Sequence, residues 1–518
     1  MNNQGKRGKR KNIIAFSLFA ILLLVNTTFA LKIPTPPSFP CNSDEPYPGA
    51  AVPLEPGQYR NPVTMPIGQD IADPAVIRYN GLYYMTGTAL GHYDGNIRLY
   101  SSTDLVNWVD LGIIYDAPNN DGDWNMCMFW ASELFIHGGY FYLSYSASPD
   151  SVLSHHRIGI ARATDIMGPY VDMKQEPMFD FGQENIDQHI FEHDGVVYMY
   201  YTNHHYPDNG IYVVPLAPDL NSTIGSHERL LKPQTGEMLI EAPWLISRDG
   251  TCYLIFSANG ANTADYMVGY ATASSPLGPF TRQGYLLTKN WWVPGPGHCS
   301  VVPSPDGEEQ FMVYHAKKDW DVSWAREACI DRLFFNPDGT LQVFGPTRDP
   351  QPLPSGVSGS TGVVSVVNPG FEMSGLTGWN LDLPWDAALY SAIIENPVAS
   401  RQGELSPCVF QGTRMLWFWS LISYTSSIQQ DVGGLVGNTT YRLVLWGASS
   451  GRDLHVEVRT GNQALNQSII NGIGTERVSL DILLPASLDT ITIKLSSDAG
   501  GANSWAWIDA VQLYNVSV

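Results

Sequence analysis

The stretch "IADPAVIRYNGLYYMTGTA" (residues 71–89) carries the pattern that decides the fold. Asp73 opens an apolar run, an Asn80-Gly81 pair follows, and a second run rich in Tyr and Met comes next. Asn-Gly between two alternating apolar runs is a strong signal for a tight β-hairpin. A carboxylate at the start of a strand that should be buried requires a reason, because removing a charge from water is costly.

Four later segments repeat this pattern. They begin at Ala131, Asp187, Glu241 and His298, and each contains an apolar strand, a Gly-containing turn and a second strand of alternating aromatic and aliphatic residues. The five starting residues lie 58, 56, 54 and 57 residues apart. Hairpin-rich repeats of this length, with almost no helical periodicity, predict an all-β fold, a five-bladed β-propeller of four-stranded blades. An ordinary β-sandwich with coincidental hairpins is the alternative.

The propeller geometry explains the position of Asp73. The first strand of each blade lines the central channel, and the starts of these strands meet at one mouth of it. We therefore expect Asp73, Asp187 and Glu241 to converge from blades one, three and four, with His298 beside them from blade five. Three carboxylates that face one cavity repel each other and resist burial, so chemistry explains them better than packing does.

Composition narrows the class of ligand. Aromatic residues make up 12% of the chain and charged residues only 15%, which suits an uncharged sugar. The formal net charge of −21 argues against nucleic acid as a partner, because phosphate binding needs basic patches.

The N-terminal residues 1–30 have the pattern of a secretory signal peptide. A basic "KRGKRK" precedes a 13-residue apolar run, and Ala30 provides a small residue for cleavage. The run is short for a membrane span, so a retained anchor is the lesser alternative. No second long apolar run follows, and we expect a secreted protein without stable membrane insertion. Six cysteines permit disulfides in an exported protein but do not fix their pairing.

The propeller pattern stops near residue 345. Residues 346–362 are rich in Pro, Gly and Ser and read as a linker. Residues 363–518 contain alternating strands such as "TYRLVLWGAS" and "TITIKLSS", which indicate a β-sandwich of jelly-roll type. The expected organisation is a signal peptide (1–30), a propeller (31–345), the linker and this second β module.

The carboxylates suit glycoside hydrolysis. One carboxyl group must be protonated to assist the leaving group, and another must be ionised to activate water or to attack. A third carboxylate nearby can keep the acid protonated through like-charge repulsion.

With these motifs, residues 60–345 resemble glycoside hydrolase family 43, five-bladed propellers that act on arabinose- and xylose-containing polysaccharides. The resemblance implies that Asp73 in "ADPAVI" is the general base and Glu241 in "EAPWLI" the general acid. It implies that Asp187 in "IDQHIFEHDG" modulates the pKa of the acid and orients it. The family inverts, so a water must fit between base and acid, whose carboxyl groups should lie roughly 6.5–9.5 Å apart.

Two further motifs belong to the resemblance. His298 in "GPGHCSVV" is implied to lie beneath the substrate and often helps to hold a central calcium through water, although a core histidine is the alternative. Arg326 in "WAREACIDRL" is implied to reach the substrate hydroxyls and the modulating aspartate. Trp124 could form the floor of a sugar subsite or pack in the core. His204 and His205 receive no role.

The C-terminal segment resembles jelly-roll carbohydrate-binding modules, through "NPGFE" near its start and "WIDAVQLY" near its end. The resemblance implies a structural calcium held by Glu372 and Asp509. The hydrolytic chemistry itself would need no cofactor.

Together these features predict a secreted, inverting glycosidase that cleaves α-L-arabinofuranosyl linkages in arabinose- or xylose-containing polysaccharides or oligosaccharides. A β-D-xylosidase and an endo-arabinanase on the same fold are the enzymatic alternatives. A non-catalytic glycan-binding protein is the alternative from another class.

Overall fold

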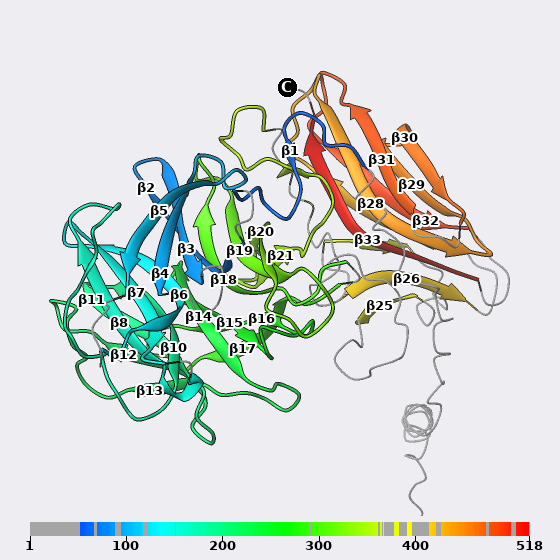
Figure 1. Cartoon of the computed structure of the whole chain (residues 1–518). Coiled ribbons are helices and arrows are strands. Elements are labelled where there is room, and N and C mark those ends of the chain that lie inside the picture. The colour runs from blue at the N-terminus through cyan, green and yellow to red at the C-terminus, as the bar shows by residue number, and fades with distance from the viewer. Residues whose placement is uncertain are drawn as a thin grey trace, which may run out of the picture.

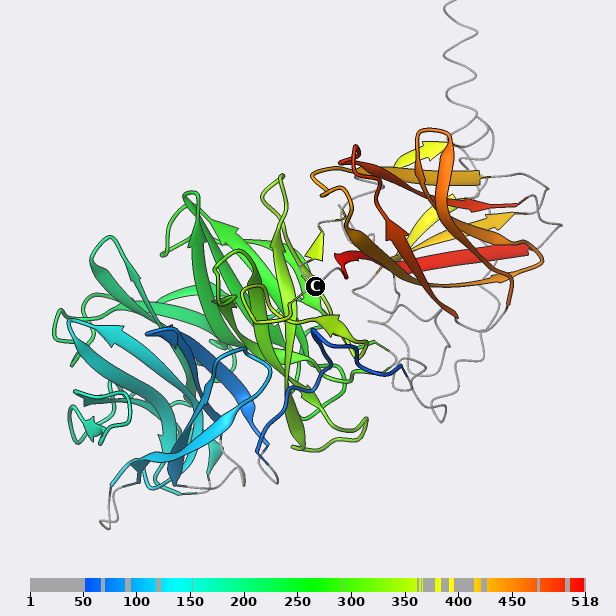
Figure 2. The same cartoon turned by 90° about the horizontal axis from the view of Figure 1, so that it is seen from above.

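Two all-β units make up the described part of the chain, a propeller followed by a β-sandwich, and Figures 1 and 2 show them as two lobes. The expected fold class is therefore confirmed. The expected signal peptide lies outside the described residues, and within them no helix has the length and apolar character needed to cross a membrane. The computed structural model describes residues 52–66, 70–88, 95–117, 123–150, 152–290, 292–360, 363–364, 366, 378–382, 391–395, 414–420, 426–472, 476–498 and 504–516.

Five four-stranded antiparallel sheets form the blades, and each uses four consecutive strands of the chain. A short 3-10 helix, η2 (Leu153–His155), lies in the second blade between its middle strands. The strands, blade by blade, are β2 (Ala72–Tyr79), β3 (Leu82–Thr88), β4 (Asn96–Ser102) and β5 (Val109–Asp116); β6 (Cys127–His137), β7 (Tyr140–Ser148), β8 (Arg157–Ala163) and β9 (Val171–Asp172); β10 (Asn185–His193), β11 (Val196–Asn203), β12 (Gly210–Pro215) and β13 (Glu228–Leu231); β14 (Ile240–Arg248), β15 (Thr251–Ala258), β16 (Met267–Ala273) and β17 (Thr281–Leu287); β18 (Gly297–Pro303), β19 (Gln310–Lys317), β20 (Arg326–Phe335) and β21 (Leu341–Phe344).

The hairpin signals in the sequence form the turns between the first two strands of the blades. Asn80 and Gly81 both have positive φ, 49° and 82°, between the paired residues Tyr79 and Leu82. Two consecutive residues with positive φ are what a two-residue type I′ hairpin requires. Blade five differs, because its first two strands pair from Pro303 to Gln310 and leave a longer turn.

Each blade begins its inner strand with a non-glycine residue at positive φ. These residues are Asp73 (54°), Ala131 (47°), Asp187 (56°), Ala242 (56°) and His298 (46°). The pairing register of the inner strand shifts at the same place in all five blades. The left-handed conformation is rare for non-glycine residues, so its fivefold recurrence is a built-in bend of the inner strand.

The same observation corrects the alignment of blade four. The residue equivalent to Asp73 and Asp187 is Ala242, not Glu241. Glu241 lies one position earlier, in the strand before the bend. The bend therefore presents the carboxyl of Glu241 to the pocket from a different backbone position.

A segment before the first blade joins it to the last blade. The Asn61 amide donates to the Ile330 carbonyl (2.8 Å) and accepts from the Ile330 N–H (2.9 Å). The N–H of Val63 donates to the Ala328 carbonyl, and the N–H of Thr64 donates to the Val106 carbonyl. Blade five and blade one are thus held to the same short stretch, which closes the ring.

The C-terminal unit is a sandwich of two antiparallel sheets. Along β32 and β31 buried residues alternate with more exposed ones, so each sheet turns one face to a shared core of Leu, Ile and Val. One sheet has the order β25 (Ser391–Glu395), β26 (Arg414–Ser420), β33 (Ser504–Asn515), β28 (Thr440–Ser450) and β31 (Glu476–Leu483), with β23 (Val363–Val364) also on β33; the other has β24 (Asn380–Asp382), β27 (Ser426–Val432), β32 (Ile491–Ser497), β29 (Leu454–Thr460) and β30 (Gln463–Ile470).

The segment expected as a linker packs on the propeller over its first half. Strand β22 (Gln351–Pro352) pairs with β1 (Gln58–Tyr59), and Arg332 donates to the Pro352 carbonyl.

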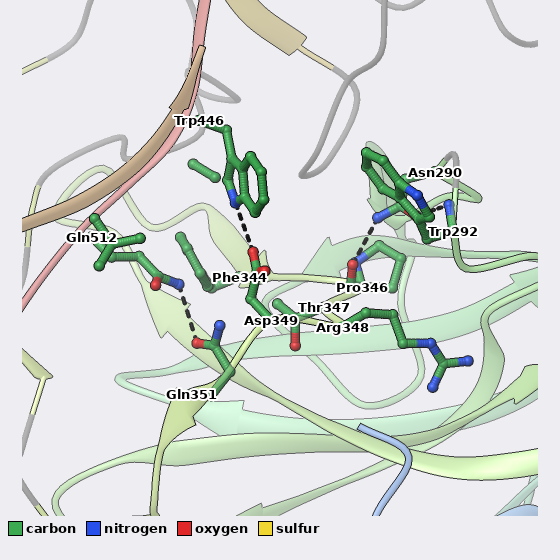
Figure 3. Close-up of a pocket in the computed structure, with 12 residues that line it drawn as sticks. Asn290, Trp292, Phe344, Pro346, Thr347, Arg348, Asp349, Gln351, Trp446 and Gln512 are labelled. Atoms are coloured by element: carbon green, nitrogen blue, oxygen red, sulfur yellow. Dashed lines mark hydrogen bonds between the residues drawn. The ribbon is translucent and has the colours of Figure 1, made fainter. Parts of the chain in front are cut away.

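Polar contacts join this segment to the sandwich. Trp446 Nε1 donates to Asp349 (2.7 Å), and Gln512 donates to Gln351 (3.1 Å), beside a small pocket between the two units (Figure 3).

The buried carboxyl of Asp331 makes the stability of the fold depend on pH. Its carboxyl accepts hydrogen bonds from Thr347 Oγ1 (2.6 Å) and Tyr314 Oη (2.6 Å). Burial outweighs these hydrogen bonds and raises the pKa of Asp331 to about 7. Between the ordinary aspartate pKa and pH 7, the folded state then binds more protons than the unfolded state, so this group's contribution to stability falls as pH rises.

We predict that the loss of melting temperature caused by Asp331→Asn is larger at pH 5 than at pH 8. The wild-type protein gains stability on acidification through this carboxyl, and the variant cannot. Thermal unfolding of both proteins at the two pH values measures the difference. An equal loss at both values would show that Asp331 does not take up a proton in this range.

Candidate active site

Asp73 is a buried carboxylate with cationic and imidazole partners. Its Oδ1 lies 3.0 Å from Arg326 Nη1, 3.2 Å from His298 Nδ1 and 3.2 Å from His315 Nδ1, and its Oδ2 accepts from Thr88 Oγ1 at 2.5 Å. Burial by itself would raise the pKa of Asp73, but the positive charge of Arg326 above all, together with His298, holds it well below its ordinary value. Asp73 is therefore ionised over the whole neutral and mildly acidic range, as a general base requires.

Asp187 lies in the opposite electrostatic situation. Its Oδ2 accepts a hydrogen bond from the Ala242 N–H (3.1 Å), which joins blade three to blade four. Burial raises the pKa of Asp187 to about 7; His298 lowers it, while Glu241 and Asp73 raise it further. Near neutral pH, a proton of this site therefore resides on Asp187 for a large part of the time.

Glu241 is held at both carboxyl oxygens. Tyr266 Oη donates to Oε1 (2.7 Å), and His204 Nε2 lies 3.0 Å from Oε2. Burial raises the pKa of Tyr266 well above its ordinary value, so the phenol keeps its proton and acts as the donor. A hydrogen bond at one oxygen and an ion pair at the other restrict the rotation of this carboxyl group, which suits a group that must direct a proton to one atom.

His298 and His315 both lie beside Asp73. Burial lowers the pKa of His315 to about 4, so the ring is neutral, and its Nδ1 accepts from the Asp73 N–H at 3.1 Å. The ring of Tyr266 stacks on His315 with centroids 5.4 Å apart. An added Cβ at Gly297 would come within 2.1 Å of the Tyr266 ring, which explains the glycine before His298.

The structure brings together Asp73, Asp187, Glu241 and His298, which the repeat placed at one mouth of the channel, and Arg326, which the family resemblance implied beside them. One contact differs from the implied arrangement, because the described carboxylate partner of Arg326 is Asp73 and not Asp187. The half-exposed Trp324 lies over the Arg326 guanidinium, 5.4 Å from the ring centroid.

The remaining predicted residues have the following surroundings, which do not test their predicted roles. Trp124 stacks on Tyr145 with centroids 5.9 Å apart and packs against the hydrophobic cluster of blades one and two. Asp509 is fully buried in the sandwich and accepts from the Ala510 N–H, and Glu372 lies outside the described residues. Four of the six cysteines, at positions 127, 252, 299 and 329, are described and are free.

Calcium at either expected place stays a prediction. Calcium takes several oxygen ligands, and His298 offers one imidazole whose Nδ1 faces Asp73. The residues described around His298 therefore do not make a calcium cage by themselves. In the described part of the chain, side chains of metal-ligand type converge in one group, Asp453, His455 and Asp498, on the partly exposed surface of the sandwich.

Sequence reasoning missed three residues of the site: His204, His315 and Tyr266. His315 is the sixth residue of β19. His204 directly follows β11, and Tyr266 directly precedes β16. The spacing of His204 and Tyr266 from the inner strands varies with loop length, and His315 lies in a second strand, where the repeat pattern carries no polar signal. The double histidine "HH" at 204–205 was the one available signal.

The comparisons with known proteins agree with this geometry. A β-D-galactofuranosidase of Aspergillus niger is 31% identical over 52% of this chain and 81% of its own length. An extracellular exo-α-(1→5)-L-arabinofuranosidase of Streptomyces chartreusis is 29% identical over 51% of this chain and 84% of its own length. The crystal structure of a thermostable family-43 glycoside hydrolase superposes with a TM-score of 0.53 and 34% identity, covering 57% of this chain and 99% of that chain.

The family model described as "Glycosyl hydrolases family 43" matches residues 59–341, which span the propeller from the closing segment to the last blade. This range is more than half of the chain and contains all the carboxylates of the site. The chain therefore belongs to glycosyl hydrolase family 43 and is a glycoside hydrolase.

Proposed function

We propose that this glycoside hydrolase is an inverting α-L-arabinofuranosidase that acts on arabinose-containing polysaccharide or oligosaccharide outside the cell. The observation that carries the mechanism is the unequal environment of the carboxyl groups. Asp73 is held ionised by Arg326, whereas Glu241 is held in a fixed orientation by neighbours on both oxygens. An ionised carboxylate that acts as base and an oriented carboxyl group that acts as acid, on different blades, are the two parts that an inverting hydrolase needs.

In this mechanism Asp73 takes a proton from a water molecule, which attacks the anomeric carbon. Glu241 gives a proton to the leaving oxygen as the glycosidic bond breaks. Asp187, with its raised pKa, keeps the negative charge between them low near neutral pH. Arg326 holds Asp73 and reaches the sugar hydroxyls.

The furanose preference is supported by the relatives, since the two named above act on furanosides. Export is supported by the signal-like pattern of residues 1–30 and by the word "extracellular" in the name of the Streptomyces relative.

A second candidate is a β-D-galactofuranosidase, because the Aspergillus relative carries that name. The α-L-arabinofuranosyl and β-D-galactofuranosyl rings have the same ring configuration and differ in the exocyclic arm. A pocket that accepts one ring can thus accept the other unless it excludes the longer arm.

Initial rates on matched aryl α-L-arabinofuranoside, β-D-galactofuranoside and β-D-xyloside test the proposal. We predict the highest kcat/KM on the arabinofuranoside, and a loss of at least roughly a hundredfold in Glu241→Ala, as for removal of a general acid. A preference for the galactofuranoside or the xyloside would replace the proposed substrate. No turnover of any of the three, while the protein binds oligosaccharide, would favour a glycan-binding protein.

Arg326→Met tests the role of Asp73. The variant removes the positive charge at 3.0 Å, so the pKa of Asp73 should rise and the acid limb of the kcat/KM profile should move up by roughly one to three pH units. The pH dependence of kcat/KM on an aryl glycoside measures the shift. Arg162→Met, at an exposed arginine of blade two, is the control and should leave the limb in place. An unmoved acid limb in Arg326→Met would remove Asp73 from the role of base.

A further inference from the structure

His204 follows the last residue of β11 and lies between two carboxyl groups. Its Nε2 is 3.0 Å from Glu241 Oε2, and its Nδ1 is 3.6 Å from Glu184 Oε2. The His204 N–H also donates to the Glu184 carbonyl at 3.3 Å. The imidazole therefore lies as an ion pair between Glu184, which precedes the inner strand of blade three, and Glu241 on the inner strand of blade four; its Nε2 lacks hydrogen-bond geometry and is buried.

The two carboxylates determine the charge of this imidazole. Burial by itself would lower the pKa of His204, but Glu184 and Glu241 raise it to about 10. His204 is thus an imidazolium ion at neutral pH, with 18% of its side chain exposed. His204 forms an ion pair with Glu241 as Arg326 does with Asp73.

Other titratable groups face this pair from the neighbouring strands. Asp187 on β10 acts on both Glu241 and His204, and Tyr266 before β16 donates to Glu241. His156, before β8, faces Glu184 and His204, and burial lowers its pKa, so it stays neutral. Within the described residues, the positive charge closest to the Glu241 carboxyl is therefore that of His204.

We propose that His204, ion-paired with Glu184, is a positioning residue for the general acid: its charge holds the Glu241 carboxyl at Oε2, the oxygen that Tyr266 does not contact, and sets the upper pH limit of activity. The proposal rests on the role of Glu241 given above. A cation beside a carboxyl group favours its ionised form.

The direct test is the basic limb of the kcat/KM profile. His204→Gln keeps a side-chain N–H but removes the charge, so Glu241 should hold its proton to higher pH, and the limb should move up by roughly one unit. Glu184→Gln should move it in the same direction by less, because His204 stays in place. His205→Gln, at the exposed neighbouring histidine, should leave it unchanged.

Leaving-group dependence separates positioning from general damage to the fold. A misplaced acid slows substrates whose leaving group needs a proton, so His204→Gln should lose about tenfold on an alkyl furanoside and far less on a dinitrophenyl furanoside. Equal losses on both substrates with an unmoved basic limb would overturn the proposal.

Histidine-selective NMR titration tests the pairing without any substrate, so it stands even if the proposed sugar is wrong. The His204 signal, assigned by its absence in His204→Gln, should titrate above pH 8 in the wild-type protein. Its midpoint should fall in both Glu241→Gln and Glu184→Gln. A midpoint near the ordinary histidine value, unchanged in both variants, would overturn the pairing. If His204→Gln does not fold, the Glu184→Gln profile and titration decide.

Discussion

The left-handed residue at the start of each inner strand is the constraint on which the site depends. Five non-glycine residues adopt positive φ at the same structural position, and each marks a shift in strand register. Such conformations cost of order 1–3 kcal/mol each and persist where surrounding structure enforces them. Here the N–H of Ala131 donates to Thr88, that of Ala242 to Asp187 and that of His298 to Ser257. The N–H of Asp73 likewise donates to His315 of blade five, so four of the five bends are stabilised by a side chain of the neighbouring blade.

These hydrogen bonds connect the fold with the chemistry. Thr88 accepts from the bend of blade two and donates to Asp73, while Asp187 accepts from the bend of blade four. Carboxyl groups of the site therefore also take part in the hydrogen bonds that hold neighbouring blades together. A substitution at Asp187 or Thr88 acts on blade packing as well as on electrostatics, which is why variants at Arg326 and His204 are better probes of charge.

The three carboxyl groups of the pocket differ in their environment because each has a different set of partners. Asp73 has a guanidinium and two imidazoles, Glu241 has a phenol and an imidazolium, and Asp187 has a backbone N–H. All three are buried, so the differences come from these partners and not from solvent. One buried proton is shared unequally among chemically similar groups, and this inequality distinguishes an acid from a base.

The repeat of hairpins predicted the propeller well, because a turn such as Asn80-Gly81 is determined by its own backbone preference. The convergence of Asp73 and Asp187 followed from the repeat alone. The register of Glu241 did not follow from the repeat. The bend of blade four lies at Ala242, only one residue later, so the spacing between repeats is almost unchanged. Tyr266 and His204 could not be found, since they reach the pocket from loops whose lengths follow no repeat.

The anomer released first shows whether Asp73 activates a water or forms a covalent bond to the sugar. If Asp73 activates a water that attacks opposite the bond protonated by Glu241, hydrolysis of an α-L-arabinofuranoside releases the β-anomer before mutarotation. Proton NMR during the first minutes of the reaction distinguishes the two anomers. We expect early accumulation of the β-anomer; early accumulation of the α-anomer would mean a covalent intermediate and would contradict the role given to Asp73.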